Sequence, residues 1–375
     1  MTKIIANYLP QFHRIPENDA WWGDGFTDWV ATKNAKPLFA GHNQPKKPLN
    51  DNYYDLSCEK SLRWQASIAS NAGIYGFGIY HYWFNSNLQL LQKPAEIILN
   101  SDISINFMFI WDNASWKRTW GNIKNANDWA PLYENNSYIR SNNGILAELI
   151  YGSESDWIKH FNYLLPFFKD HRYIRNYQGK PLFMFFNTDS NTEILNNIAD
   201  CWNKLAISSG LPGICFLERT NKNQSSIFDF RVDYEPVQHG WNHSAFINRI
   251  LEKAIFFKEN KFNQCHLLNY DKLWADIIKS AKNCKNDTLL FGSFVNYDDS
   301  PRRGRKGRIV CGATPYKFQK YMTELLKICS IKNKEFLFLT AWNEWGEGAY
   351  LEPDELNGFS YLDAIKNAIN DSSNS

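Results

Sequence analysis

The sequence predicts a single (β/α)8 barrel, an α/β fold of TIM type in which eight parallel strands alternate with helices and carry long βα loops. The first observation is a series of eight strand-like apolar runs, and the second is the set of amphipathic segments that separate them. The third is the length of 375 residues, which suits a barrel folded as one unit.

The predicted strands are mostly continuous apolar runs, as expected when both faces of a parallel strand are covered. In chain order they are Lys3–Leu9, Ile74–Tyr82, Ile105–Trp111, Pro181–Phe186, Gly213–Leu217, Phe228–Tyr234, Leu289–Val295 and Glu335–Ala341. Amphipathic patterns predict helices over Glu59–Asn71, Asp156–Lys169, Thr192–Ser208, Tyr270–Lys282 and Pro315–Lys332. Thr314 precedes a first-turn proline, which is a favourable start for the last of these helices.

One domain is expected. The barrel is assigned to residues 1–370, because no linker, internal repeat or charge block divides the chain. Residues 371–375 are rich in Ser and Asn, and we expect them to form a disordered tail. The hydrophobic share of 44% is ordinary for a globular protein with a sizeable core.

Charge and cysteine usage narrow the class of protein. A net charge of +2 implies no strong field for nucleic acid or for a membrane surface. The cysteines are scattered and form no C-x-x-C pair: Cys58, Cys201, Cys215, Cys265, Cys284, Cys311 and Cys329. This spacing predicts reduced thiols in a cytoplasmic protein. The N-terminus enters a strand-like run at once, and no apolar stretch reaches bilayer-spanning length, so neither a signal peptide nor a transmembrane helix is expected.

Aromatic residues are abundant, at 16% of the chain. Many of them fill the core, but others stand beside polar residues, as in Asp19-Ala20-Trp21-Trp22-Gly23-Asp24. Apolar rings next to hydrogen-bonding groups suit a sugar, which has an apolar face and a rim of hydroxyls. The composition therefore favours a carbohydrate ligand.

Polar and aromatic residues converge on the end of the predicted barrel where sites are found, the carboxyl-terminal ends of the strands. The candidate substrate-binding residues there are Tyr8, Gln11, His13, His81, Tyr82, Trp83, Trp111, Asn113, Tyr234, Glu235, Tyr297, Trp342, Asn343 and Trp345. Their common position on one rim predicts the location of the site.

Glu344 and Glu347 are the candidate catalytic residues. Work on a glycosidic bond needs an acid for the leaving oxygen and a second carboxylate for the developing cation. The two glutamates stand three residues apart on the turn after the last strand, so a helical turn would point both the same way. Two close carboxyls shift each other's pKa, which leaves one protonated near neutrality. The alternative is a solvated pair beside core tryptophans; placement at a strand end favours catalysis.

A basic loop follows the seventh strand. Arg302 and Arg303 lie in the segment 296–308, which holds five cations together with glycines. Loops after the seventh and eighth strands of barrels often bind phosphate, so an anionic or phosphate-linked substrate is one hypothesis. A solvated basic loop is the equally weighted alternative.

The segment from Trp21 to Leu49 is expected to form a long loop after the first strand. Its Trp21 and Trp22 predict a wall for the substrate, although loop aromatics also pack helices onto a barrel. His239 and His243 lack a carboxylate that would complete a metal set, and no Gly-rich phosphate loop follows a strand. Neither a metal nor another cofactor is therefore expected.

Several segments together resemble the WbsX-type proteins of bacterial surface-polysaccharide gene clusters, which are similar to glycoside hydrolase family 99. The resemblance rests on Tyr8-Leu9-Pro10-Gln11-Phe12-His13, on the segment 16–29, on Lys36-Pro37-Leu38-Phe39, on the segment 163–168, on Gly179-Lys180-Pro181-Leu182-Phe183, on Pro301-Arg302-Arg303-Gly304 and on Trp342-Asn343-Glu344-Trp345-Gly346-Glu347-Gly348. It spans nearly the whole chain, and the first and last blocks are highly specific.

This resemblance implies a (β/α)8 barrel that acts on α-mannosidic linkages with retention. It further implies that Glu344 acts as a base on the 2-hydroxyl, which attacks the anomeric carbon, and that Glu347 acts as acid/base at the leaving oxygen. One departure stands out. The family usually carries W-A-N-E-N-W after the third strand, whereas this chain has Trp111-Asp112-Asn113-Ala114-Ser115-Trp116. The missing glutamate at Ala114 indicates altered substrate choice.

Two further functions compete with a glycosidase or transglycosylase. The first is a sugar-nucleotide-dependent glycosyltransferase of lipopolysaccharide biosynthesis, which is the label that WbsX-type proteins carry. The second is a non-catalytic glycan-binding barrel. In each case the expected partner is an O-antigen or capsule oligosaccharide or polysaccharide, with possible peripheral association with membrane-bound assembly enzymes.

Overall fold

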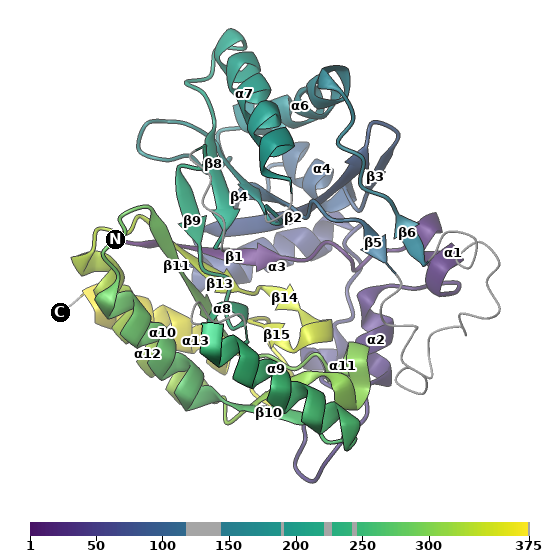
Figure 1. The fold of residues 1–375 in the computed structure, drawn as a ribbon, viewed down its shortest axis with the longest axis vertical. Helices are drawn as coiled ribbons and strands as arrows, with labels where there is room; N and C mark the ends of the chain where they lie inside the picture. The colour runs from purple at the N-terminus through teal and green to yellow at the C-terminus, as the bar shows by residue number, and fades with distance from the viewer. Residues whose placement is uncertain (118–143, 189–190, 221–226, 242–245, 374–375) are drawn as a thin grey trace.

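The structure is a computed structural model that describes residues 1–117, 144–188, 191–220, 227–241 and 246–373. Eight parallel strands close into a barrel at its centre, which confirms the predicted fold (Figure 1). They are β1 (Lys3–Tyr8), β2 (Gly76–Asn85), β4 (Asn106–Trp111), β7 (Leu182–Phe185), β8 (Cys215–Arg219), β9 (Phe230–Val232), β11 (Leu289–Phe294) and β13 (Phe336–Thr340). The barrel closes because β1 pairs with both β2 and β13, so that Ile5 stands opposite Gly76 on one side and Phe338 on the other.

Both faces of the barrel strands are buried, as the continuous apolar runs predict. In β4, Phe107 and Met108 are 0% exposed although successive side chains point to opposite faces of a strand. The backbones also approach closely in places. A Cβ on Gly292 of β11 would lie 1.9 Å from the carbonyl oxygen of Asp233, so only glycine allows β11 to lie this close to the end of β9.

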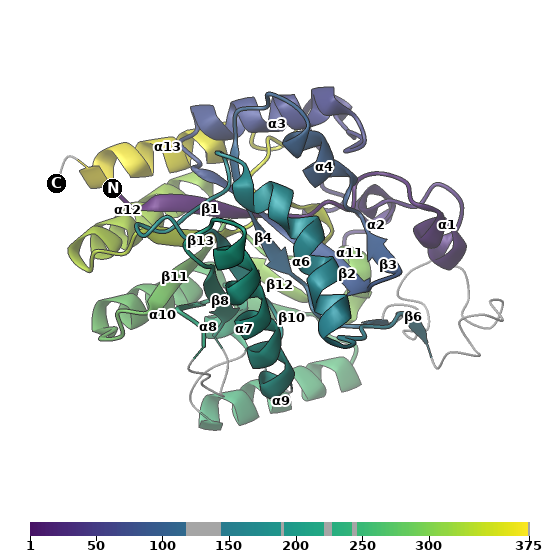
Figure 2. The same cartoon turned by 90° about the horizontal axis from the view of Figure 1, so that it is seen from above.

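The five predicted helices are all present and cover the outside of the barrel (Figures 1 and 2). They are α3 (Glu59–Asn71), α6 (Glu154–Lys169), α7 (Thr192–Ser208), α10 (Tyr270–Asn283) and α12 (Pro315–Ile331). The helix starts follow known capping rules. Thr314 accepts a hydrogen bond from the backbone N–H of Lys317, and Ser153 and Asp156 form a capping box at α6.

The described residues form further helices that the sequence pattern did not predict. They are α1 (Pro16–Trp22), α2 (Asp28–Asn34), α4 (Lys93–Leu99), α8 (Val237–Gly240), α9 (Phe246–Lys261), α11 (Ser300–Arg303) and α13 (Ser360–Ser373). The segment from Trp21 to Leu49, predicted as a loop, thus contains α2 and the end of α1. Each of these two helices has seven residues, about two turns, which is too short to display a helical period.

Short strands and 3-10 turns complete the fold. They are β3 (Leu88–Leu90), β5 (Trp116–Lys117), β6 (Ile145–Ala147), β10 (His266–Asn269), β12 (Arg308–Cys311), β14 (Asn343–Glu344), β15 (Ala349–Tyr350), η1 (Leu49–Asp51), η3 (Gly304–Lys306) and η4 (Trp345–Glu347). Of these, β5, β6, β14 and η4 contribute residues to the site.

The expected tail at 371–375 is corrected for its first three residues, because α13 continues to Ser373. The hydroxyls of Ser372 and Ser373 donate to the carbonyl of Ile369, and Asp371 accepts from Gln319 of α12. Residues 374–375 lie outside the described part. The polar side chains of Asp371, Ser372 and Ser373 thus form hydrogen bonds within the helix or to α12.

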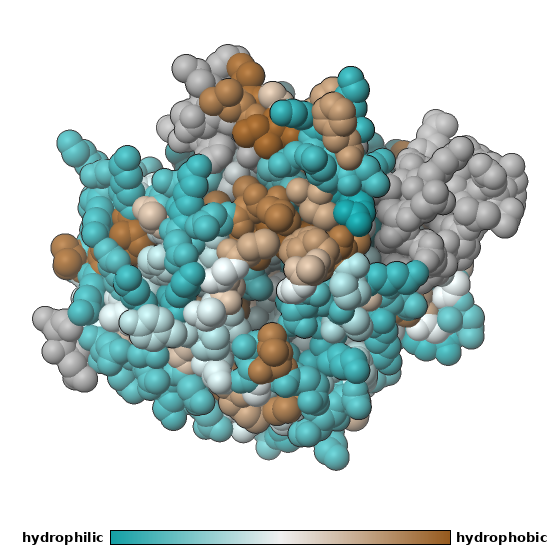
Figure 3. All heavy atoms as spheres, turned by 90° about the horizontal axis from the view of Figure 1, so that it is seen from below, coloured by the Kyte–Doolittle hydropathy of each residue, from teal (hydrophilic) through white to brown (hydrophobic). Residues whose placement is uncertain are grey.

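In the described part of the chain, no helix has the length and apolar character needed to cross a bilayer. On the face drawn in Figure 3, apolar side chains form separate groups surrounded by hydrophilic ones. The predicted cytoplasmic location stays a prediction.

Candidate active site

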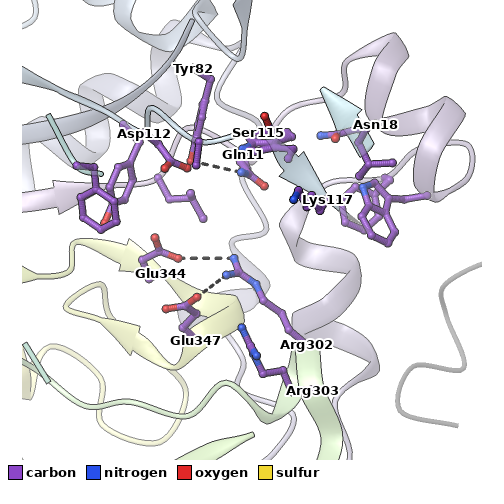
Figure 4. A pocket seen from close by; sticks show the side chains of 18 of the residues that line it. Gln11, Asn18, Tyr82, Asp112, Ser115, Lys117, Arg302, Arg303, Glu344 and Glu347 are labelled. Atoms are coloured by element: carbon purple, nitrogen blue, oxygen red, sulfur yellow. Dashed lines mark hydrogen bonds and ion pairs between the residues drawn. The ribbon is translucent and has the colours of Figure 1, made fainter. Parts of the chain in front are cut away.

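A cavity of about 530 Å³ opens at the carboxyl-terminal ends of the barrel strands (Figure 4). Barrel enzymes place their sites at this end, and the volume is typical of small-molecule sites. Its described lining residues are Leu9, Gln11, Asn18, Trp22, Phe26, Tyr80, Tyr82, Asp112, Ala114, Ser115, Trp116, Lys117, Leu146, Phe186, Tyr234, Arg302, Arg303, Glu344 and Glu347. Aromatic rings, carboxyl groups and cationic side chains thus line the same cavity.

A tight turn after β13 brings Glu344 and Glu347 to this cavity. Glu344 ends β14, and Glu347 ends the 3-10 turn η4 that follows. The chain then reverses at Gly348, whose φ of 57° is left-handed, and pairs back as β15. A Cβ on Gly348 would lie 2.9 Å from the Cβ of Asp298, so the turn needs glycine for space as well as for backbone angle. Both glutamates point into the cavity (Figure 4).

One guanidinium joins the two glutamates. Arg302 of α11 donates from Nη1 to Glu347 Oε1 at 2.7 Å, and its Nη2 lies 3.6 Å from Glu344 Oε2. The same Nη2 donates to Asp28 Oδ1 at 2.9 Å. Asp28 begins α2 and is held by the backbone N–H of Gly346, 3.2 Å from its Oδ2. Three carboxyl groups therefore surround one buried cation.

The two glutamates differ in their surroundings. The side chain of Glu344 is 6% exposed, whereas that of Glu347 is 24% exposed. Burial raises the pKa of Glu344 well above its usual range, the charge of Glu347 raises it further, and Arg302 lowers it. Oε2 of Glu344 accepts no hydrogen bond from the residues that the structure describes. Glu344 is thus the carboxyl group whose ionised form is disfavoured, while Glu347 is ion-paired with Arg302.

Glu344→Gln is expected to stabilise the protein near neutral pH by on the order of 1 kcal/mol in the free energy of unfolding. The raised pKa means that the ionised carboxylate is disfavoured in the folded state. Stability is therefore lost as pH rises above the unfolded-state pKa of about 4.3, until the folded-state pKa is passed. A neutral amide avoids this loss. Urea unfolding at pH 7 measures the difference.

Glu193→Gln, an exposed position on α7, is the matched control for this change. It is expected to leave stability nearly unaltered, since surface substitutions have small effects. A Glu344→Gln protein that is less stable than the wild type would show that the carboxylate is well accommodated.

The hypothesis that Arg302 and Arg303 bind an anionic substrate stays a prediction, and the ion pairs of both residues disfavour it. The charge of Arg302 is already balanced by Asp28 and Glu347 and lies near Glu344. Arg303 lines the cavity as well, but its Nε pairs with Asp299 Oδ2 at 3.0 Å. A guanidinium that is buried among carboxylates has no spare charge for a phosphate.

The structure brings eight of the sequence-predicted residues to the cavity and places the others elsewhere. Those that line it are Gln11, Trp22, Tyr82, Tyr234, Arg302, Arg303, Glu344 and Glu347. They come from loops or strand ends that are far apart in the sequence. Gln11 and Tyr82 also contact each other, with Gln11 Nε2 donating to the Tyr82 hydroxyl at 3.4 Å.

Three predicted residues point to the outside of the barrel. His81 Nε2 lies 2.7 Å from His160 Nε2 on α6, and Trp83 stacks on the same histidine with ring centres 4.3 Å apart. Trp111 stacks on Trp202 of α7 at 6.0 Å. Because side chains alternate along a strand, His81 and Trp83 face away when Tyr80 and Tyr82 face in. These side chains pack helices onto the barrel.

Five predicted residues, Tyr8, His13, Trp342, Asn343 and Trp345, are buried but do not line the cavity. Asn343 Oδ1 accepts from the backbone N–H of Leu9 at 2.7 Å, which ties β14 to the end of β1. Trp345 donates from Nε1 to Glu352 at 2.7 Å, and the Tyr8 hydroxyl donates to Gln65 at 2.7 Å. His13 and Trp342 are also buried outside the lining.

The remaining predicted residues also stand outside the lining. Trp21 packs edge-on against Trp116 with ring centres 6.1 Å apart, and Tyr297 packs against Trp241 at 5.1 Å. Glu235 forms an ion pair with His239, and Asn113 is bonded to Tyr151 and Asn187. The hydrogen bonds of Asn113 hold the segment that carries Asp112 at the edge of the cavity.

Sequence reasoning missed several lining residues. They include Asn18, Tyr80, Asp112, Trp116 and Phe186. For Tyr80 a signal exists in the sequence, because it stands two residues before Tyr82 and the two share a strand face. The ion pair between Asp28 and Arg302 joins residues 274 positions apart, and no local pattern signals it.

The sequence profile of the family described as "Glycosyltransferase WbsX" matches residues 4–365 of the chain. A curated relative, "Uncharacterized protein WxcX" of Xanthomonas campestris pv. campestris, is 27% identical over 377 residues. This match covers 98% of the chain and 49% of the relative. The chain thus spans about half the length of the curated relatives it matches.

Two solved structures share the fold. The chain superposes on the "GH99 endo-alpha-mannosidase from Bacteroides thetaiotaomicron" with a TM-score of 0.56 and 14% identity, covering 99% of this chain and 97% of that one. It superposes on a "Glycoside hydrolase-like protein" with a TM-score of 0.57 and 12% identity, covering 98% and 93%. At such identities the likeness concerns the barrel alone.

Proposed function

The chain belongs to the WbsX glycosyltransferase family, and from this premise we propose that it is a carbohydrate-active enzyme that cleaves or transfers at glycosidic bonds. One observation carries the proposal. Two carboxyl groups with unlike surroundings, Glu344 and Glu347, face one aromatic-walled cavity and are joined by Arg302. Two carboxyl groups with different pKa values can serve as the general acid and the general base in the cleavage of a glycosidic bond.

In the proposed reaction, an α-mannosidic or similar bond is broken with retention. Glu344 takes the proton of the 2-hydroxyl as that oxygen attacks the anomeric carbon, and Glu347 gives a proton to the leaving oxygen. Water or an acceptor sugar then opens the anhydro-sugar with the proton transfers reversed. A neighbouring hydroxyl is already in place, so no protein nucleophile is required.

The electrostatics add a condition to these roles. The raised pKa of Glu344, caused first by its burial, disfavours its ionised form, whereas the reaction starts with Glu344 ionised and Glu347 protonated. The reactive form is therefore the less populated of the two singly protonated states of the pair. In compensation, a carboxylate whose pKa is raised is a stronger base when it is ionised.

The reactive form of the pair carries one proton, so the basic limb of the pH profile of kcat/KM is expected to follow the raised pKa of Glu344 and to lie clearly above the ordinary glutamate value of about 4.3. Activity falls as pH rises through this pKa, because the pair then loses the proton that Glu347 must give to the leaving oxygen. Initial rates between pH 4 and 9 measure this. A rate that stays constant at high pH, or a basic limb at the ordinary glutamate value, would contradict the proposed pair.

A sugar-nucleotide-dependent transferase is the second candidate function, favoured by the family description. Product analysis by mass spectrometry decides between the two. The protein is incubated with O-antigen or capsule fragments, with and without GDP- and UDP-sugars. Shortened or exchanged glycans without nucleotide support the glycosidase proposal, and nucleotide release that depends on the acceptor supports the transferase.

The expected polysaccharide substrate, its bacterial surface origin and contact with assembly enzymes belong to this proposal. The expected absence of a metal and of any other cofactor stays a prediction. The third possibility, a glycan-binding barrel without activity, is left if sugars bind and neither assay shows turnover.

A further inference from the structure

A third carboxyl group lines the cavity and has no part in the reaction described above. Asp112 is the first residue after β4, and it lies across the cavity from Glu344 in Figure 4. Its backbone N–H donates to the carbonyl of His81 at 3.1 Å, so β2 helps to fix its position. Asn187 donates from Nδ2 to Asp112 Oδ1 at 3.1 Å. No lysine, arginine or histidine of the described residues lies within ion-pair distance of its carboxylate.

The residue that follows works as an anchor. Asn113 donates from Nδ2 to the Tyr151 hydroxyl at 3.0 Å and to the Asn187 carbonyl at 2.6 Å, and its Oδ1 accepts from the Asn187 N–H at 2.7 Å. Asn113 is therefore turned away from the cavity, while its two neighbours, Asp112 and Ala114, both line it. The segment thus places positions 112 and 114 at the cavity, while the hydrogen bonds of Asn113 tie it to Tyr151 and Asn187.

Positions 112 and 114 stand on either side of Asn113, and both line the cavity. A carboxyl group at position 114 would therefore face the same space from a different place. Exchanging the two residues moves a hydrogen-bond acceptor along the edge of the cavity without removing it.

We infer that Asp112 selects the substrate of the proposed reaction, by accepting hydrogen bonds from the hydroxyls of a neutral sugar ring seated beside Glu344 and Glu347. The inference rests on the proposed function. A carboxylate has about four acceptor sites, and Asn187 fills one of them on Oδ1 of Asp112, so sugar hydroxyls can donate to the others. The charges around the cavity do not favour an anionic ring, because Arg302 is ion-paired with Asp28 and Glu347, Arg303 is ion-paired with Asp299, and Asp112 is itself a carboxyl group.

The surroundings of Asp112 add a pH signature. Burial raises the pKa of Asp112 to about 6, against the lowering influence of Arg219, Asn187 and Trp116. Arg219 comes from β8, while Tyr82 of β2 and Glu344 are the other ionisable groups that feel the charge of Asp112. Sugar binding is expected to weaken as pH falls through this value, because a protonated carboxyl loses acceptor strength.

Binding of small glycosides tests the inference without any need for turnover. The probes are the methyl α-glycosides of mannose, glucose and galactose, with glucuronic acid as the anionic comparison, titrated by NMR against the full chain. Asp112→Ala is expected to weaken the binding of the preferred neutral glycoside about tenfold to a hundredfold. Asp112→Asn is expected to bind with no pH dependence near 6, and Asp112→Ala/Ala114→Glu to change which glycoside binds best.

Controls separate this inference from failure to fold and from the proposed function. Asp363→Asn on exposed α13 should bind as the wild type does, and thermal unfolding verifies that each variant folds. Glu344→Gln should lose turnover but keep binding that depends on Asp112. Equal binding by the wild type and Asp112→Ala, or preference for glucuronic acid, overturns the inference. Binding that depends on Asp112 in a wild type that turns over no glycan overturns the proposed function and leaves the binding site standing.

Discussion

Glu347→Gln is expected to lower kcat for glycan turnover by roughly a hundredfold to ten-thousandfold, and Glu344→Gln by a similar factor. Glu347 is partly exposed at the cavity, so its carboxyl can reach a leaving oxygen and exchange its proton with water. The amide in Glu347→Gln can neither give nor take that proton. In Glu344→Gln the base is lost instead. Initial rates with the natural glycan measure both effects.

Substrate choice sharpens this test. A substrate with a good leaving group needs little protonation, so Glu347→Gln should recover part of its rate on an activated aryl glycoside, whereas Glu344→Gln should not. Glu193→Gln, at an exposed position of α7 that does not line the cavity, serves as the matched control and should act as the wild type does. Variants of either glutamate that keep full turnover would remove the pair from the chemistry.

Arg302→Ala is expected to lower the free energy of unfolding by about 3–5 kcal/mol. Its guanidinium is the shared partner of Asp28, Glu347 and Glu344, and its side chain is 8% exposed. Removing it leaves like charges buried side by side with no cation between them. Urea unfolding at pH 7 measures the loss, and unfolding at low pH should show a smaller one because the carboxyls are then protonated.

Arg63→Ala is the matched control, because Arg63 also contacts two carboxylates, those of Glu59 and Asp102, but does so at the surface. Its loss is expected to lower stability only slightly, because solvent and salt screen ion pairs at the surface. If Arg302→Ala lowers stability no more than Arg63→Ala does, the three carboxyls around Arg302 do not depend on it for their burial.

The barrel could be predicted because its strands carry their signal locally. Each strand is an apolar run whose two faces are buried, and the helices between them have a regular apolar stripe. Short helices such as α1 and α2 escaped prediction, since two turns show no period. The helical end at Ser373 was not predicted either. A segment rich in Ser and Asn has the composition of a disordered tail, and the sequence does not show that the serine hydroxyls donate to the carbonyl of Ile369.

The glutamate pair could be predicted because the two residues are close in sequence and follow a strand. The partners of the pair could not, because Asp28 and Arg302 reach the cavity from loops after different strands. Successive side chains of a strand point to opposite faces, so Tyr82 faces the cavity while its neighbours His81 and Trp83 face outward. The candidate list contained all three residues because it was drawn from strand ends without regard to this alternation. Asp112 follows the end of β4 directly, but nothing in its local sequence shows that its side chain turns inward.

The most direct test of the proposed chemistry is the configuration of the first product. Proton NMR of the anomeric signals follows the wild-type protein as it acts on an α-linked glycan with no nucleotide present. Attack by the 2-hydroxyl, assisted by Glu344, predicts that the α-anomer appears first and slowly converts to the equilibrium mixture. A β-anomer formed first, or turnover that begins only when a sugar nucleotide is added, would contradict the account.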